Sequence, residues 1–175
     1  MNSDRSNYCH AYIGLGSNLG DRVQNIIDAR RHLLELTFVQ SLQSSSLYLS
    51  SPVGYFDQAD FINCVVSLTV ACDAATLFEE MQKIELFLAR VRDARNQNAP
   101  RTIDLDLLMF GDLQNADPRL TIPHPRMAER LFVLQPLSEL APNLEIPNLG
   151  GIDKIVAEGL TQGRFAGQDL FKLGV

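Results

Sequence analysis

The sequence predicts an α+β fold, namely a ferredoxin-like β-α-β-β-α-β sandwich with additions at the C-terminus. Three observations lead to this prediction. Short apolar runs and segments of helical period follow one another in that order along the chain. No internal repeat, low-complexity tract or linker divides the sequence, so we expect one domain over residues 1–175. The 175 residues are 46% apolar and 21% charged, which is typical of a globular protein with a sizeable core.

The first predicted elements are a strand and a helix. A polar tail over residues 1–7, which we expect to be disordered, precedes a buried strand over residues 8–15 that ends in glycines. Asp21 and Gln24 have capping-box spacing, and apolar residues then recur with the helical period. The first helix is therefore expected over residues 22–36.

Two strands and a second helix follow. A Ser-rich, half-exposed strand is expected over residues 38–49, and an apolar strand over residues 61–70. The intervening residues 50–60 contain proline and glycine and form a loop. Asp73 then caps a helix. The apolar face of this helix is formed by Leu77, Phe78, Met81, Ile84 and Leu88.

The second half of the chain is less regular. Residues 91–100 lack any period and are Asn-rich before a proline, which indicates a mobile loop. A strand over residues 102–110 closes at a Gly-Asp turn, and a short strand is expected over 120–122. Residues 126–140 are mostly helical with an interruption at Pro136, and a weaker helix is expected over residues 152–160. The region after residue 149 is weakly patterned, and we assign no role to it.

The net charge of −6 is unevenly distributed. Between Arg90 and Arg130 lie seven arginines, no lysine and six acids, a net charge of +1, and the rest of the chain carries −7. A generic binder of a nucleic-acid backbone needs the opposite overall sign, so no nucleic-acid partner is expected. Residues 36–56 lack charge but contain six serines, so no membrane association is expected either.

The cysteines indicate a reducing compartment. Cys9, Cys64 and Cys72 form no C-x-x-C pair and lie in apolar runs, which favours buried, reduced thiols. Their odd number and the lack of an N-terminal signal peptide predict a cytoplasmic protein.

Residues 14–20 form a glycine-rich segment between the first strand and the first helix. Its spacing is G-x-G-x-x-x-G, whereas a dinucleotide-binding loop has G-x-G-x-x-G, and no acid ends the second strand. No Gly-Lys-Ser/Thr sequence occurs, which excludes a P-loop. The segment is best interpreted as a tight strand-to-helix turn that braces a neighbouring site.

The pair Asp104 and Asp106 is the strongest chemical signal. Residues two apart on a strand point to the same face, with Cα atoms roughly 6.5–7 Å apart, while Ile103, Leu105 and Leu107 take the other face. Adjacent carboxylates repel each other unless a cation or arginines neutralise them. Mg²⁺ accepts one or two carboxylates together with phosphate oxygens. The alternative is a solvated strand face, which the otherwise apolar strand and the flanking arginines disfavour.

Arginines on both sides of this pair suggest phosphoryl transfer. Guanidinium groups bind phosphate oxygens through two hydrogen bonds, and catalysis of phosphoryl transfer depends mostly on positioning and charge neutralisation. His124 lies between two prolines that fix its backbone, although it could equally be a satisfied turn histidine. Phe61 and Phe132 are either core residues or two rings on which a flat heterocycle stacks.

Four motifs in this order resemble the 6-hydroxymethyl-7,8-dihydropterin pyrophosphokinases of folate synthesis. They are AYIGLGSNLGDR from Ala11, SSPVGYFDQADFINCVV from Ser50, APRTIDLDLLMFGD from Ala99 and LTIPHPRMAERLFVLQPL from Leu120. The combination of R-T-I-D-L-D with I-P-H-P is highly specific to that family. The resemblance implies a ferredoxin-like fold, two Mg²⁺ ions, and transfer of pyrophosphate from ATP to the pterin's hydroxymethyl group with release of AMP.

The resemblance also implies a role for individual residues. Asp104 and Asp106 correspond to the pair that bridges both metal ions, and Arg90 and Arg101 to the catalytic arginines. The implied ATP site consists of Gln82, Glu85, Arg92, Leu107, Arg119, Thr121, His124 and Arg130. The implied pterin site consists of Ser50, Pro52, Val53, Phe61, Asn63 and Phe132, with the two rings on either side of the pterin. We expect the enzyme to act as a monomer.

The chain departs from the family pattern at a few positions. The glycine that usually precedes Pro-Arg is Ala99, and the chain has no tryptophan, so Asn96, Gln97 and Asn98 stand in the long loop instead. Phe61 stands where tyrosine is often found, and Pro125 where an aromatic residue sometimes follows the histidine. None of these changes touches the acid pair.

Two other functions are consistent with parts of the sequence. A non-catalytic ferredoxin-like nucleotide- or RNA-binding module would have aromatic residues on its central strands and a basic surface. The net charge and the acids on the presumed binding strand oppose it. The other alternative is a different Mg²⁺-dependent nucleotidyl or phosphoryl transferase that uses the same acids, and the pterin-side residues distinguish it.

Overall fold

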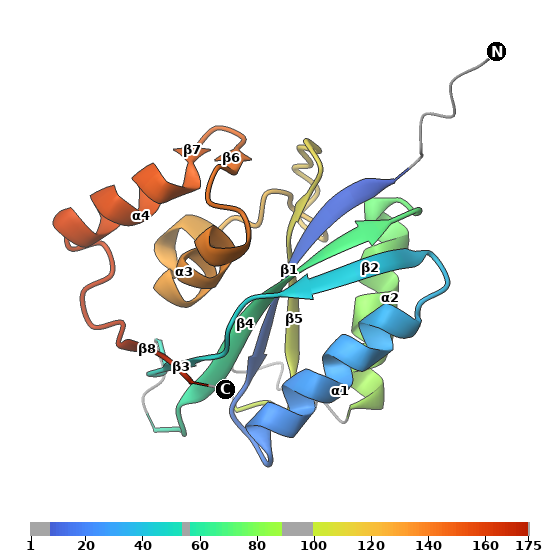
Figure 1. Ribbon diagram of the computed structural model, residues 1–175, viewed down its shortest axis with the longest axis horizontal. Helices are drawn as coiled ribbons and strands as arrows, with labels where there is room; N and C mark the ends of the chain where they lie inside the picture. The colour runs from blue at the N-terminus through green and yellow to red at the C-terminus, as the bar shows by residue number, and fades with distance from the viewer. Residues whose placement is uncertain (1–7, 54–56, 89–99, 175) are drawn as a thin grey trace.

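The computed structural model describes residues 8–53, 57–88 and 100–174 and is built around an antiparallel sheet (Figure 1). The strands are β1 (Cys9–Ser17), β2 (Val39–Ser44), β3 (Tyr48–Ser50), β4 (Phe61–Val70), β5 (Asp104–Phe110) and β8 (Leu170–Lys172). Their order is β5-β1-β4-β3-β8, and β2 also pairs with β4. A separate two-stranded ladder joins β6 (Glu145–Ile146) to β7 (Gly150–Gly151).

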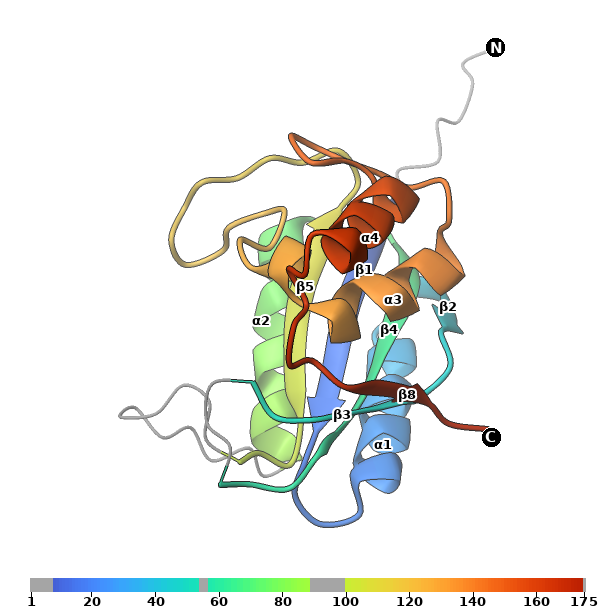
Figure 2. The same cartoon turned by 90° about the vertical axis from the view of Figure 1, so that its left-hand side faces the viewer.

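Helices cover both faces of the sheet. Helices α1 (Arg22–Glu35) and α2 (Ala74–Phe87) lie on one face, and α3 (Leu131–Leu140) and α4 (Ile152–Thr161) lie on the other (Figures 1 and 2). Each layer has its own apolar cluster. Ile13, Leu33 and Leu77 belong to the cluster under α1 and α2. Val65, Leu108 and Leu134 belong to the cluster under α3 and α4.

Local sequence signals explain where the first two helices begin. The Asp21 side chain accepts a hydrogen bond from the backbone N–H of Gln24 at 3.0 Å, and Asp73 caps α2 by accepting from Thr76 at 2.7 Å. Each bond satisfies a backbone donor that the first turn of a helix leaves without a partner. Both helix starts are confirmed as predicted.

The long strand predicted over residues 38–49 is wrong in one respect, because it divides into β2 and β3 at a run of serines. Ser45 donates its backbone N–H to the carbonyl of Val65 at 2.9 Å and accepts the Val65 N–H on its hydroxyl at 3.0 Å. Serine hydroxyls compete with the backbone for hydrogen bonds. The side chain of Ser45 thus replaces a main-chain partner, and the strand bends there.

Other element predictions also need correction. The strand predicted from residue 102 begins at Asp104, and the strand predicted over residues 120–122 is a single bridge between Asn115 and Ile122. The helical stretch predicted over residues 126–140 is a short 3₁₀ turn, η1 (Met127–Glu129), followed by α3, which contains Pro136. Of the three cysteines only Cys64 is buried, and burial raises its pKa to about 12, whereas Cys9 and Cys72 are half-buried.

The C-terminal region, to which the sequence assigned no role, is ordered against the rest of the molecule. Helix α4 packs on α3, and β8 pairs with β3, the strand that leads to Ser50. Among the described residues, the helices are too short or too polar to span a membrane.

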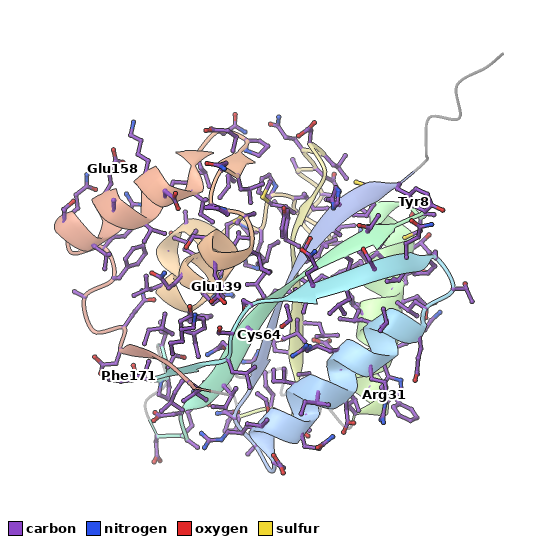
Figure 3. All side chains as sticks on the ribbon, in the orientation of Figure 1. Tyr8, Arg31, Cys64, Glu139, Glu158 and Phe171 are labelled. Carbon is purple, nitrogen blue, oxygen red and sulfur yellow. The ribbon has the colours of Figure 1, made fainter. Side chains whose placement is uncertain are left out.

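Glu139 connects α3 to the β2–β3 segment. Its carboxylate (Glu139 is labelled in Figure 3) accepts hydrogen bonds from the Ser46 backbone N–H at 3.1 Å and from the Tyr48 hydroxyl at 2.8 Å. Lys172 Nζ lies 3.4 Å from it. Burial and then the hydrogen bond from its own hydroxyl to this carboxylate raise the pKa of Tyr48 to about 12.

Candidate active site

The acid pair lies on β5 at one edge of the sheet. Leu105 and Leu107 are 5% and 4% exposed and enter the core beneath α1 and α2, whereas Asp104 and Asp106 are half-buried and alternate with them. Because successive strand residues point to opposite faces, the two carboxylates share the face that α1 and α2 do not cover. This confirms the side-chain alternation predicted from the sequence.

Each carboxylate of the pair is bound by an arginine. Arg101 Nη1 lies 2.7 Å from Asp104 Oδ2, and Arg130 Nη1 lies 3.1 Å from Asp106 Oδ2. The side chains of the two arginines are only 12% and 17% exposed. Charges that are shielded from water interact more strongly than surface charges, so these ion pairs offset the repulsion between the two acids.

His124 and Phe132 lie close to this group. The His124 backbone N–H donates to Leu108 on β5 at 2.9 Å, and its Nδ1 accepts from the Arg126 N–H at 3.2 Å. Burial lowers the pKa of His124, and the accepting Nδ1 leaves the proton of the neutral ring on Nε2. The Arg130 guanidinium carbon lies 5.6 Å from the centre of the Phe132 ring, and burial also lowers the Arg130 pKa.

Asn63, Gly16 and Asp104 form one row across β4, β1 and β5. In the register of the sheet, Gly16 is opposite Asn63 on one side and opposite Asp104 on the other. Directly opposed residues of antiparallel strands share a face and have Cα atoms about 5 Å apart, so about 10 Å separates Asn63 from Asp104. The row therefore joins the acid pair to the predicted pterin-side residues on a single face.

Gly16 leaves the space that these side chains occupy. A Cβ atom at this position would lie 3.1 Å from Asn63 Oδ1 and 3.8 Å from Phe61 Cδ1. Asn63 is 5% exposed and donates from Nδ2 to Ser50 Oγ at 2.8 Å, and Phe61 is paired with Ser50 in the β3–β4 register. Gly16, Ser50, Phe61 and Asn63 thus form one contiguous group. The neighbouring Pro52 is buried and Val53 is 46% exposed.

Asn18 braces the site, and sequence reasoning did not single it out. Its side chain donates to Gln58 Oε1 at 2.9 Å and to the Ala59 carbonyl at 3.2 Å, and it accepts from the Arg101 N–H at 2.7 Å. The residue is 3% exposed. The glycine-rich turn is therefore bonded to the segments on both sides of it, as its interpretation as a bracing turn requires. The local sequence marks Asn18 only as an asparagine directly after a strand, a common turn residue, and does not identify its distant partners.

Glu85 on α2 is bonded to β5, the edge strand of the sheet. It is 2% exposed, and its Oε1 accepts the backbone N–H of Leu105 at 2.8 Å. Gln82 lies one helical turn earlier and is half-buried. The side chain of Leu107 is in the core, so only its main chain is available to a ligand. The ATP-side role implied for these three residues is a prediction that these contacts leave untested.

Two further predicted ATP-side residues, Arg119 and Thr121, are bonded to Asp117, which leaves their implied role an untested prediction. The Arg119 side chain is 88% exposed and pairs with Asp117 at 2.7 Å, and the Thr121 hydroxyl donates to the Asp117 carbonyl at 3.1 Å. The hydrogen bonds from Arg119 lower the pKa of Asp117 to about 2. Arg90, Arg92 and most of the loop predicted to be mobile over residues 91–100 lie outside the described residues.

The acid pair has the donor chemistry of a partly open cation site. In the described parts of the chain, no three or more His, Cys, Asp and Glu side chains converge as they do in a metal centre made of protein ligands alone. Asp104 and Asp106 contribute only carboxylate oxygens, the ligand type that Mg²⁺ prefers when phosphate oxygens and water complete its shell. The residues therefore fit a cation that is bound together with a polyphosphate.

Comparison with known proteins gives a consistent result. Residues 12–142 match the family model of 7,8-dihydro-6-hydroxymethylpterin-pyrophosphokinase. The 2-amino-4-hydroxy-6-hydroxymethyldihydropteridine pyrophosphokinase of Bacillus subtilis is 44% identical over 135 residues, which cover 77% of this chain and 80% of that protein. The protein of the same name from Pseudomonas aeruginosa is 41% identical over 149 residues, covering 83% and 89%.

A solved structure shares the fold. The wild-type HPPK-DHPS of Plasmodium falciparum, solved with pterin and p-hydroxybenzoate, superimposes with a TM-score of 0.69 at 15% identity. The superposition covers 94% of this chain and 44% of that longer chain, so this chain corresponds to less than half of it. This likeness shows that the two chains share a mixed α/β fold. The chain belongs to the 7,8-dihydro-6-hydroxymethylpterin-pyrophosphokinase family.

Proposed function

We propose that this protein transfers the pyrophosphoryl group of ATP to the hydroxymethyl group of 6-hydroxymethyl-7,8-dihydropterin and releases AMP. Membership of the family supports this reaction, which is a step of folate biosynthesis. The structural observation that carries the proposal is the row Asn63–Gly16–Asp104. It puts a buried amide and a pair of carboxylates about 10 Å apart on one sheet face, enough for a heterocycle on one side and a polyphosphate on the other.

The pterin is proposed to bind on the Asn63 side of the row. The buried amide of Asn63 is fixed by its bond to Ser50 and offers hydrogen-bonding groups to the edge of a heterocycle. Phe61 and Phe132 supply ring faces, and flat heterocycles stack favourably on such rings. Pro52 and Val53 complete this side.

ATP is proposed to bind on the acid side, where Asp104 and Asp106 would hold Mg²⁺. Bound Mg²⁺ would neutralise charge on the polyphosphate. Arg101 and Arg130 form ion pairs with these acids, so their guanidinium groups lie beside the proposed metal site and are proposed to donate hydrogen bonds to phosphate oxygens. The proposed ATP contacts also include Gln82, Glu85, Leu107, Arg119, Thr121 and His124, with Arg90 and Arg92 from outside the described residues.

The chain contributes mainly positioning and charge stabilisation to the reaction. The pterin hydroxymethyl oxygen forms a bond to the β-phosphorus of ATP while the bond from that phosphorus to the oxygen bridging to the α-phosphorus breaks. AMP leaves, and the hydroxyl proton is released to water. Arg101, together with Arg90 from outside the described residues, is proposed to stabilise the negative charge that develops on the transferred group. Neutral His124 can donate from Nε2 to a phosphate or ribose oxygen. No side chain is assigned as general base, which phosphoryl transfer does not require.

The finer description of the fold belongs to the same proposal. The antiparallel order β5-β1-β4-β2, with α1 and α2 on one face, supports a ferredoxin-like β-α-β-β-α-β unit extended by α3, α4 and β8. We further propose that residues 1–175 form one domain that acts as a monomer.

The test of the proposal is ligand binding to Asn63→Ala. Pterin binding should be abolished, because the only buried amide of the described pterin-side group is removed, and Mg·ATP binding should remain. Calorimetric titration of each ligand separately provides the internal control. If ATP affinity fell and pterin affinity did not, the assignment of the two sides would be wrong.

A further inference from the structure

The C-terminal segment, residues 168–172, lies on the same side of the sheet as α3 and contacts both sides of the proposed pterin site. Figure 2 shows the chain after α4 running past α3 to β8, which lies beside β3. At its start, the Gln168 side chain donates from Nε2 to the Glu129 carbonyl at 2.8 Å. The same side chain accepts the backbone N–H of Leu131 on Oε1 at 2.9 Å. One amide group thus binds the main chain on both sides of Arg130.

Gln168 supplies a contact that α3 lacks locally. Arg130 is the N-cap residue of α3, and its side chain makes no capping hydrogen bond. The first N–H groups of a helix have no partner within the helix, so an acceptor must come from elsewhere. Gln168 provides it for Leu131 from 37 residues away. The bonded segment carries Arg130, which binds Asp106, and leads directly to Phe132.

The next residues of the segment bind the other side of the pterin site. The Asp169 N–H donates to Ser51 Oγ at 3.2 Å, and its carbonyl accepts the Ser51 N–H at 3.3 Å. Leu170 is then paired with Ser50 in the β3–β8 register. Ser50 in turn accepts the hydrogen bond from Asn63. Two consecutive residues, Gln168 and Asp169, therefore join the segment before Phe132 to the strand beside Asn63.

Both ends of the C-terminal segment are fixed. Upstream, Phe165 is 5% exposed, and a Cβ at Gly159 would lie 2.3 Å from its ring, so α4 and Phe165 are packed without free space. Downstream, Lys172 is within 3.4 Å of Glu139, and the Leu173 N–H donates to the Leu47 carbonyl at 2.9 Å. A segment anchored at both ends can hold the groups that it binds at a fixed separation.

We propose that Gln168 is a positioning residue for the pterin site, setting the separation between Phe132 and the Ser50–Asn63 pair through its bonds on either side of Arg130. This inference rests on the proposed function, because it assumes that the pterin lies between these two sides. It assigns Gln168 no contact with substrate. Without Gln168, Arg130 remains bonded to Asp106, so the acid side keeps its own anchor.

The test uses Gln168→Leu, which keeps the size of the side chain and removes both hydrogen bonds. The matched control is Gln162→Leu, the same change at an exposed position in the same region whose side chain accepts only a 3.4 Å bond from Arg164 in the structure. Each protein is titrated calorimetrically with 6-hydroxymethyl-7,8-dihydropterin, and steady-state kinetics give KM for the pterin, KM for Mg·ATP and kcat. Two hydrogen bonds of ordinary strength predict that Gln168→Leu raises the pterin Kd by about five- to fiftyfold. KM for Mg·ATP should change less than twofold, roughly within the effect of a surface substitution.

Two further variants separate positioning from stability. Gln168→Glu keeps the acceptor for the Leu131 N–H at a helix N-terminus that favours negative charge, so it should recover part of the pterin affinity. Ser51→Ala removes the other contact of the same link. If both contacts belong to the same connection, the double variant Ser51→Ala with Gln168→Leu should lose little more pterin affinity than Gln168→Leu alone. The first substitution already breaks the connection, so the effects of the two are not additive. Should Gln168→Leu fail to fold, Ser51→Ala with the same titrations decides the question.

The outcomes distinguish failure of the positioning role of Gln168 from failure of the proposed function. Unchanged pterin affinity in Gln168→Leu, or an equal loss of pterin and ATP affinity, overturns the positioning role while the proposed function stands. Failure of the wild-type protein to bind the pterin overturns the proposed function itself.

Discussion

Replacing Gly16 with alanine perturbs the point where the two sides of the proposed site meet. The new Cβ would lie 3.1 Å from Asn63 Oδ1, which is tighter than ordinary van der Waals contact, and 3.8 Å from Phe61 Cδ1. The Asn63 amide must move by a few tenths of an ångström, away from the 2.8 Å hydrogen bond that it makes to Ser50. The perturbation therefore acts on the pterin side and leaves the ion pairs of the acid side in place.

The expected size of the effect follows from that one hydrogen bond. Weakening a buried hydrogen bond costs about 1 kcal/mol, and each 1.4 kcal/mol is a factor of ten in Kd, so pterin affinity should fall about fivefold. Stability should change little. Alanine reduces the freedom of the unfolded chain, which stabilises the protein by about 0.4–1 kcal/mol and offsets the displaced amide.

Gly14→Ala is the matched control for this substitution. Gly14 lies on the same strand and face, but the three heavy atoms nearest to a Cβ there belong to the Leu108 side chain at 3.6–3.8 Å, an ordinary packing distance. The assay is calorimetric titration of both variants with the pterin, together with thermal unfolding. Equal pterin affinity in the two variants, or a loss in Gly14→Ala alone, would refute the argument that Gly16 is needed to make room for Asn63.

Three further predictions follow from other contacts. Asp104→Ala should lower turnover by about a hundredfold or more through loss of a metal ligand, and near-normal kcat at saturating Mg²⁺ would contradict the metal assignment. Glu85→Ala should destabilise the protein by about 1–3 kcal/mol in urea unfolding, because a buried backbone N–H of β5 loses its acceptor, whereas Glu85→Gln should restore most of that loss. Glu139→Gln should lower the pKa of Tyr48 from about 12 towards its usual value of about 10, because it removes a negative charge that disfavours the phenolate. Burial, the larger cause, keeps the pKa above that value, and ultraviolet titration against a Tyr48→Phe reference measures it.

Features that depend on neighbouring residues in the sequence were predictable. The caps at Asp21 and Asp73 form within three residues, and the alternation around Asp104 and Asp106 requires only the two-residue period of a strand. Each was predicted and is present.

Features that depend on contacts between distant residues were not predictable. The break between β2 and β3 depends on the Ser45 hydroxyl meeting Val65, 20 residues later. The bracing by Asn18 depends on a hydrogen bond with Arg101, 83 residues later, and the cap of α3 on Gln168. A single sequence does not indicate these pairings. Glutamine and serine are common surface residues, and their partners here are backbone groups, which every residue has. The role of Gly16 was likewise visible only when the register placed Asn63 opposite it.

The central claim is that the reaction transfers a pyrophosphoryl group, and the nucleotide product measures this most directly. Wild-type protein is incubated with Mg·ATP, with and without 6-hydroxymethyl-7,8-dihydropterin, and the nucleotides are separated by chromatography. AMP should form in an amount equal to the pterin consumed, and no AMP should form when the pterin is omitted. ADP as the product would show transfer of a single phosphoryl group, and unchanged ATP in the presence of bound pterin would show a binding protein; either result would contradict the account.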